Sequence, residues 1–172
     1  MIKLDENDLV FAKVNPNAII PTREEGNAGY DIYACFDEDY IEIKPHETKL
    51  IPTGIATALH SSKYLQVEER GSTGSKGIKK SAGVIDSSYR GEIFIAITNT
   101  NNGYLFITKL NEKTMKEKTY YNTGDILYPY TKAIAQLVVH EVPEMDVVEI
   151  SYEELQQISS TRGDGKLGSS GK

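Results

Sequence analysis

The chain has 172 residues, no tryptophan and a single cysteine. One cysteine excludes an internal disulfide framework. Because Cys35 follows a strand-like run, we expect it to be a small buried hydrophobic residue rather than a nucleophile. The three histidines, His46, His60 and His140, lie far apart in the sequence, so no Cys/His cluster has the spacing of zinc ligands.

Long hydrophobic runs and a basic surplus are also missing. No stretch approaches the roughly 20 apolar residues that span a bilayer, and residues 1–20 mix charges with isolated apolar residues, unlike a signal peptide. We therefore expect a cytoplasmic protein of one domain that does not associate with a membrane. The net charge of −6 disfavours general nucleic-acid binding. An acidic protein can still bind a polyphosphate where a few cations converge and a metal ion neutralises the ligand.

Many short apolar segments, broken by turn residues, dominate the sequence. Strand-like segments occur at 41–43, 49–59, 93–97 and 134–142. This pattern predicts an all-β barrel or jelly roll rather than alternating strands and helices. One short helix is expected at about 152–157, because Ser151 and Glu154 have the spacing of a capping box.

Two segments look irregular. Residues 99–130 include the polar stretch NEKTMKEKTYYNTG, which indicates a solvated loop or hairpin insertion. The Ser/Gly-rich end has the composition of a flexible terminus. We therefore expect a β-barrel domain at 1–158 and a C-terminal arm at 159–172.

Residues 83–92, GVIDSSYRGE, are the most informative run. A turn after Ile85 predicts a β-hairpin, whose mouth would present backbone donors and acceptors to a flat base edge. Tyr89 could pack there against a sugar. Taken alone, Asp86 is more often a turn residue than a catalyst.

Two glycine- and serine-rich stretches carry basic residues. They are EERGSTGSKGI at 68–78 and TRGDGKLGSSGK at 161–172. Glycines let backbone N–H groups approach an anion, hydroxyls add donors, and cations supply charge. Neither stretch is a Walker A loop, which needs Gly-Lys-Ser/Thr at the start of a helix. Each is a weak signal for phosphate binding on its own.

Taken together, five segments in order resemble the motifs of the trimeric dUTPase family. They are AGYDIYA at 28–34, the run 70–76, GVIDSSYRGE at 83–92, AIAQLVV at 133–139 and RGDGKLGSSG at 162–171. The resemblance implies a jelly-roll-like barrel and Mg²⁺-dependent hydrolysis of dUTP to dUMP and pyrophosphate. It also implies a homotrimer whose sites combine motifs of different subunits, with the C-terminal arm crossing to a neighbour.

The resemblance also assigns catalytic and nucleoside-binding roles. Asp86 would orient or deprotonate the water that attacks the α-phosphorus, and Gln136 would reach a phosphate oxygen or that water. Tyr89 would pack against the deoxyribose and leave no room for a 2′-hydroxyl. The backbone of Gly83, Val84 and Ile85 would recognise the uracil edge.

Phosphate binding falls to two groups of residues by the same resemblance. The first comprises Arg70, Gly71, Ser72 and Lys76, and the second, in the arm, comprises Arg162, Gly168, Ser169 and Ser170. Leu167, also in the arm, would bind the substrate at the uracil base instead. Mg²⁺ would be held mainly by the phosphates and water, with no direct protein ligand. Asp31 would contact it through water.

The sequence departs from the family in four places. Gly71 stands where the family has a serine, Leu167 replaces the phenylalanine that caps uracil, and Lys166 replaces a glycine. We expect Leu167 to give a weaker or more mobile lid, because ring stacking contributes roughly 1 kcal/mol. The segment 108–130 replaces the family's short Gly-Asp-basic turn, as in some bacteriophage members. It is either a surface excursion or a partner-binding element.

Two rival functions use the same scaffold. A dCTP deaminase needs a glutamate on the strand after the third motif, but IFIAITN at 93–99 contains no acid, and Glu92 matches the dUTPase pattern. A non-catalytic regulatory protein would explain the insertion and the altered arm. The retention of Asp86, Tyr89 and Arg70 argues against it.

Overall fold

The structure is a computed structural model that describes residues 3–165. It is built from twelve short strands and three short helices within that range. The strands are β1 (Leu9–Lys13), β2 (Gly29–Ile32), β3 (Tyr40–Ile43), β4 (Thr48–Pro52), β5 (Ile55–Leu59), β6 (Lys63–Glu68), β7 (Ile78–Lys80), β8 (Val84–Ile85), β9 (Phe94–Asn99), β10 (Leu105–Thr108), β11 (Ile126–Pro129) and β12 (Ala135–Glu141). The helices are α1 (Gly71–Gly74), α2 (Glu112–Lys118) and α3 (Tyr152–Gln157).

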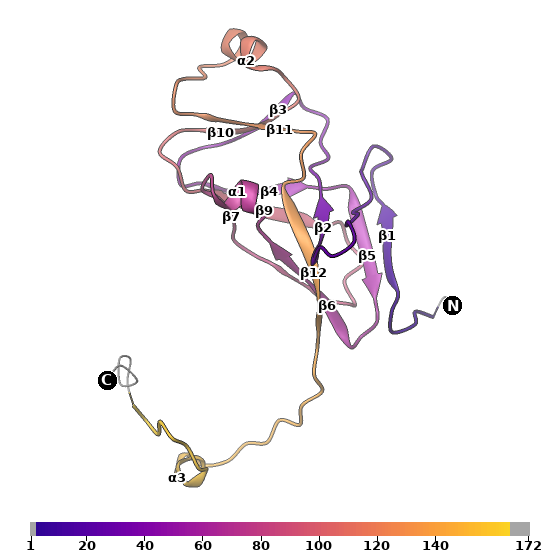
Figure 1. Ribbon diagram of the computed structural model, residues 1–172, viewed down its shortest axis with the longest axis vertical. Helices are drawn as coiled ribbons and strands as arrows, with labels where there is room; N and C mark the ends of the chain where they lie inside the picture. The colour runs from indigo at the N-terminus through magenta and orange to yellow at the C-terminus, as the bar shows by residue number, and fades with distance from the viewer. Residues whose placement is uncertain (1–2, 166–172) are drawn as a thin grey trace.

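The strands form four small sheets around one hydrophobic core (Figure 1). Their orders are β1-β5, β11-β10-β3, β2-β12-β6-β8 and β4-β9-β7. Alternating side chains point inward, as in β5, where Ile55, Thr57 and Leu59 are buried. Each large aliphatic side chain in the core contributes about 1.5–3 kcal/mol. The predicted all-β architecture is confirmed, and Cys35 is buried in the core as expected.

The hairpin predicted at 83–92 was wrong. Strand β8 pairs with β6, through Leu65 opposite Ile85, whereas β9 pairs with β4 and β7 in another sheet. The segment between β8 and β9 makes a turn in which the Tyr89 N–H donates to the Asp86 carbonyl at 3.1 Å. The two strands then diverge, so the turn connects strands of two different sheets and not two strands that pair with each other.

The helix predicted near 152–157 is α3, and Ser151 and Glu154 form the capping box. The expectation of one helix missed α1 and α2. In α2, Asn111 caps the N-terminus by accepting a hydrogen bond from the Thr114 N–H at 3.0 Å. Met115 is the buried residue of that helix.

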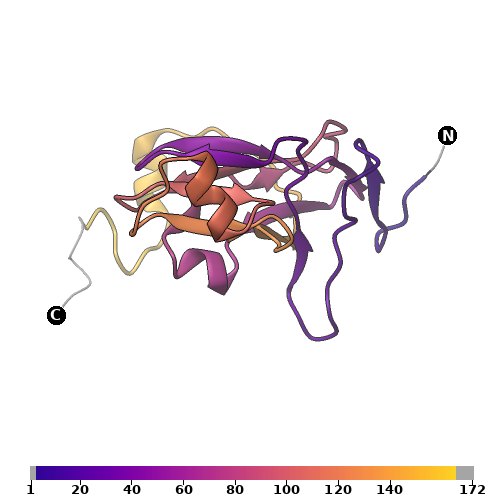
Figure 2. The ribbon, with the colours of Figure 1, turned by 90° about the horizontal axis from the view of Figure 1, so that it is seen from above.

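The insertion is folded rather than loose. Strand β11 pairs in parallel with β10, and α2 lies at one end of the molecule beside this sheet (Figures 1 and 2). Lys118 forms an ion pair with Asp39 at 2.6 Å, and the Tyr120 hydroxyl donates to Glu42 at 2.7 Å. Segment 108–130 is therefore attached to the body through β3 and its flanks.

After β12 the chain leaves the body as an extended arm that carries α3 (Figure 1). The arm and the N-terminal segment lie on opposite sides of the molecule (Figure 2). Residues 142–164 are exposed, including the large apolar side chains of Val147 and Val148. The boundary at residue 158 stays a prediction, since the last strand of the body ends at Glu141. No helix within residues 3–165 is long and apolar enough to cross a membrane.

Candidate active site

Two surface pockets contain residues that the sequence analysis assigned to substrate. The Arg70 pocket, of about 390 Å³, is lined by Asn27, Ala28, Gly29, Asp31, Arg70, Gly71, Ser72 and Gln136. The Asp86 pocket, of about 270 Å³, is lined by Val84, Ile85, Asp86, Tyr89, Glu92, Ile93 and Phe94. The two pockets share no lining residue, so one chain presents the predicted site in two parts.

The Arg70 pocket lies beside paired strands β2 and β12, where Asp31 stands opposite Gln136. Arg70 Nε donates to Asp31 Oδ1 at 2.9 Å, and Arg70 Nη1 donates to the Ala133 carbonyl at 3.3 Å. The side chains of Arg70 and Asp31 are 30% and 33% exposed. The guanidinium is therefore fixed at the pocket wall while part of it still faces solvent.

Helix α1 fixes the backbone of the same arginine. The buried Thr73 hydroxyl donates to the Arg70 carbonyl at 2.9 Å and accepts from the Arg70 N–H at 3.0 Å. Sequence reasoning missed Thr73, although a threonine three residues after the first residue of a turn is a common capping signal. Ser72 is exposed at the pocket, and a Cβ atom built on Gly71 would meet no atom within 4 Å.

Gln136 is held against the floor of the Arg70 pocket. Its Nε2 donates to the Glu69 carbonyl at 2.9 Å. A Cβ atom at Gly29 would overlap the Gln136 side chain, so glycine is needed there for the close approach of β2 to β12. Within one chain, Gln136 therefore lies with Arg70 and Asp31, and not among the residues that line the Asp86 pocket.

The Asp86 pocket lies at the end of β8, which is the edge strand of its sheet. One side of β8 pairs with β6, and the Gly83 carbonyl accepts from the Val67 N–H at 2.7 Å. The other side faces away from the sheet, so backbone groups of Val84 and Ile85 can meet a flat ligand edge. Gly83 does not line this pocket, so its predicted contact with the base stays a prediction. The Asp86 side chain is exposed at this pocket.

Tyr89 forms the wall opposite the β8 edge. Its hydroxyl donates to the Glu92 carbonyl at 3.1 Å, and its side chain is 46% exposed. A Cβ atom at Gly91 would overlap the ring, so the glycine lets the tyrosine lie against the backbone. The Arg90 guanidinium donates to the Ser87 carbonyl at 2.6 Å and holds the turn closed. Sequence reasoning overlooked Arg90, which lies within the recognised run.

Glu92 also lines the Asp86 pocket, but its carboxylate has a structural partner. Its Oε1 accepts from the Gly54 N–H at 2.7 Å. Gly54 has a φ of 65°, and a Cβ there would overlap Ala18 and Asn15. Glu92 therefore ties the pocket to the turn between β4 and β5.

Other predicted residues do not reach either pocket. Lys76 lines neither pocket, and Arg162 lies on the arm, where its Nε donates to the Gly165 carbonyl at 3.2 Å. Leu167, Gly168, Ser169 and Ser170 lie outside the described residues. The roles assigned to all of these residues stay predictions.

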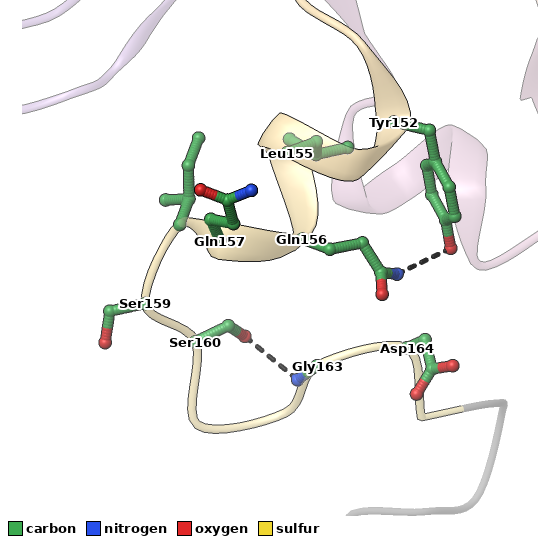
Figure 3. A pocket seen from close by; sticks show the side chains of 9 residues that line it. Tyr152, Leu155, Gln156, Gln157, Ser159, Ser160, Gly163 and Asp164 are labelled. Atoms are coloured by element: carbon green, nitrogen blue, oxygen red, sulfur yellow. Dashed lines mark hydrogen bonds between the residues drawn. The ribbon is translucent and has the colours of Figure 1, made fainter.

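A larger cavity, of about 630 Å³, is formed by the arm itself (Figure 3). Its walls come from α3 and the turn after it, where the Ser160 hydroxyl accepts from the Gly163 N–H at 3.0 Å. Among the described residues, its lining includes Asp164 and no lysine or arginine. That part of the lining offers a triphosphate no compensating positive charge, unlike the Arg70 pocket.

No group of three or more His, Cys, Asp or Glu side chains within residues 3–165 could hold a metal ion. Asp31 contributes one oxygen to its ion pair with Arg70 and remains partly exposed at the pocket. This set of donors fits a cation that arrives with a polyphosphate better than a resident metal held by the protein.

Comparison with known proteins decides the family. The dUTPase family model matches residues 15–112. The chain belongs to the dUTPase family. It is 31% identical over 170 residues to the deoxyuridine 5′-triphosphate nucleotidohydrolase of Mycobacterium marinum, covering 96% of each chain.

Solved dUTPase structures share the fold. A mutant dUTPase of Staphylococcus bacteriophage 80alpha with dUpNHpp matches with a TM-score of 0.72 and 27% identity, covering 96% of this chain and 99% of that one. A mutant dUTPase of the S. aureus phage phi11, described with a structural Mg(II) ion, matches with a TM-score of 0.65 and 21% identity, covering 86% and 99%. The predicted jelly-roll type of fold is thereby confirmed.

Proposed function

We propose that this protein hydrolyses dUTP to dUMP and pyrophosphate in a Mg²⁺-dependent reaction. One observation carries the proposal: the exposed carboxylate of Asp86 stands in a small pocket between the free edge of β8 and the ring of Tyr89. Such a pocket fits a nucleoside and a water molecule. The relatives named deoxyuridine 5′-triphosphate nucleotidohydrolase support the same substrate.

Asp86 acts on the attacking water, whereas other residues bind the phosphates. Asp86 accepts a hydrogen bond from a water molecule and so orients the oxygen of this water toward the α-phosphorus. As the new P–O bond forms, the bond from the α-phosphorus to the bridging oxygen breaks, and pyrophosphate leaves with the electron pair. The water proton passes to Asp86. Positioning contributes more than basicity here, because the carboxylate is exposed to solvent.

Arg70, Ser72 and Gln136 hold the phosphates in this proposal. The guanidinium already points along a fixed direction through Asp31 and the Ala133 carbonyl, so little reorganisation accompanies binding. Bound Mg²⁺ would neutralise phosphate charge, and Asp31 would accept hydrogen bonds from its water ligands. The phi11 dUTPase description of a structural Mg(II) ion supports a metal in the family without locating it here.

The proposal requires more than one copy of the chain. The Arg70 pocket and the Asp86 pocket share no lining residue, and the arm carries Arg162 on a segment that extends from the body (Figure 1). We propose a homotrimer in which the pockets of two neighbouring subunits face each other. The arm 159–172 would then bring Arg162 to the γ-phosphate of a neighbouring site.

A dCTP deaminase on this scaffold has less support. Deamination needs an acid beside the base to carry protons, and Glu92, the last residue of the third motif, accepts a hydrogen bond from the Gly54 N–H. Non-catalytic regulation also has less support, since Asp86 remains exposed at a pocket. A partner on the insertion is compatible with catalysis, and deletion of residues 109–123 would test it: loss of a partner should leave dUTP hydrolysis in place.

A cytoplasmic location is part of the same proposal. The single thiol, Cys35, is buried, and burial raises its pKa. A single cysteine forms no disulfide within the chain, which is compatible with a reducing compartment.

The proposal is tested by pyrophosphate release from dUTP, dCTP, dTTP and UTP with Mg²⁺, comparing the wild type with Asp86→Asn. We expect turnover of dUTP alone, and we expect the substitution to lower it at least about 100-fold. Formation of a uracil product from dCTP, or undiminished turnover by Asp86→Asn, would overturn it.

A further inference from the structure

A tyrosine of the insertion lies directly behind the Arg70 pocket. Tyr128 belongs to β11, is 2% exposed, and donates its hydroxyl hydrogen to the Ala133 carbonyl at 2.6 Å. Arg70 Nη1 donates to the same carbonyl oxygen at 3.3 Å. One oxygen atom therefore receives hydrogen bonds from both the insertion and the arginine.

The phenol is a fixed donor in this place. Burial raises the pKa of Tyr128, while the nearby Arg70 guanidinium and the Ser72 hydroxyl act in the opposite direction and only partly offset it. The ring therefore stays neutral at physiological pH. A neutral phenol carries no negative charge. Beside the guanidinium it therefore does not compete with the phosphates as an anionic partner of Arg70.

We propose that Tyr128 is a positioning residue for Arg70, so that strand β11 of the insertion fixes the direction in which the guanidinium meets a phosphate. This inference rests on the proposed function insofar as Arg70 binds the triphosphate of dUTP. The guanidinium is held on one side by Asp31 and on the other by the Ala133 carbonyl. Tyr128 holds that carbonyl in place.

A purely structural role for Tyr128 predicts something different. If its hydroxyl only stabilised β11, removing it would lower the melting temperature and leave the relative affinities for ligands with and without phosphates unchanged. If it positions Arg70, the loss must depend on the phosphates and on the presence of Arg70. These two dependences can be measured separately.

The test compares Tyr128→Phe with Tyr120→Phe in the full-length protein. Both substitutions remove one hydroxyl from the insertion, but Tyr120 is exposed and donates to Glu42 instead. We expect Tyr128→Phe to weaken the binding of dUpNHpp about three- to ten-fold, the range for one lost hydrogen bond, and to leave deoxyuridine binding unchanged. Tyr120→Phe should change neither.

A double-mutant cycle completes the test. In an Arg70→Ala background, Tyr128→Phe should have no further effect on dUpNHpp binding, because the group that it positions is gone. The inference would be overturned if Tyr128→Phe weakened dUpNHpp binding equally in both backgrounds or did not change it. Weaker binding of deoxyuridine would overturn it as well. If the protein bound dUpNHpp but did not hydrolyse dUTP, the proposed function would fail while the affinities still tested the role of Tyr128.

Discussion

The two pockets are built in opposite ways. The Arg70 pocket is rigidly supported within one chain: Asp31, the Ala133 carbonyl and Thr73 all bond to Arg70. The Asp86 pocket is open, with an exposed carboxylate and a half-exposed Tyr89 at the edge of a sheet.

This difference follows from what each pocket is proposed to bind. Phosphate charge is best met by cations that are already in place, because reorganisation during binding lowers affinity. A nucleoside needs a shaped wall, and a neighbouring subunit can supply the missing side. In the proposed trimer, a composite site would keep its charged half inside one chain and would complete its shape-selective half with a neighbouring subunit.

The largest expected effect separates catalysis from binding. Asp86→Asn keeps the shape of the side chain but removes its charge, so kcat for dUTP should fall about 10²- to 10⁴-fold, the range for a lost general base. The affinity for dUpNHpp, measured by calorimetry, should stay near the wild-type value. A comparable loss of affinity would mean that Asp86 binds substrate rather than activating water.

Arg70→Ala should act on the other pocket. A charged hydrogen-bond partner of the phosphates would be lost, and we expect dUpNHpp binding to weaken about 10- to 100-fold. Deoxyuridine binding should not change. Arg90→Ala offers a contrast, since this arginine donates hydrogen bonds to carbonyl groups in the turn of the Asp86 pocket. Its loss should weaken the binding of dUpNHpp and of deoxyuridine to a similar extent.

The sequence singled out segments that line both pockets, but it did not predict how the strands around them pair. The segments around Asp86 and Arg70 were recognisable because their residue types and order are distinctive. The hairpin at 83–92 was wrong because strand partners are decided by non-local packing, here of β8 on β6.

The missed residues differ in how much signal they gave. Asn111 and the basic end of α2 carry ordinary helix signals within a segment that looked like a loop. The contribution of Tyr128 could not be predicted, because only the folded chain brings β11 behind Arg70.

Tyr89→Ala should affect selectivity more than rate. The ring is the wall expected to exclude a 2′-hydroxyl, and its loss should reduce the preference for dUTP over UTP about ten-fold, as for other small steric differences. The ratio of kcat/KM for the two nucleotides measures this. Tyr89→Phe should keep the preference, so a loss in that variant would instead assign selectivity to the hydroxyl and its bond to Glu92.

Gly71→Ser should give the smallest effect. A Cβ at Gly71 meets no atom within 4 Å, so the substitution fits the structure. The added hydroxyl could donate to a phosphate, and we expect dUpNHpp binding to tighten about three-fold. Gly71→Ala is the matched control and should leave affinity unchanged. Equal gains in both variants would point to the local backbone instead of the hydroxyl.

The shared site is tested most directly by mixing two impaired variants and measuring hydrolysis at a dUTP concentration well below the wild-type KM. Asp86→Asn chains retain the Arg70 pocket, and Arg70→Ala chains retain the Asp86 pocket. The subunits of the two variants are dissociated and reassembled together in equal amounts. About a quarter of the sites should then pair two intact pockets across a trimer interface. The rate of dUTP hydrolysis should return to about that fraction of the wild-type rate. Mixtures that assemble but hydrolyse dUTP no faster than the average of the two separate variants would contradict the account.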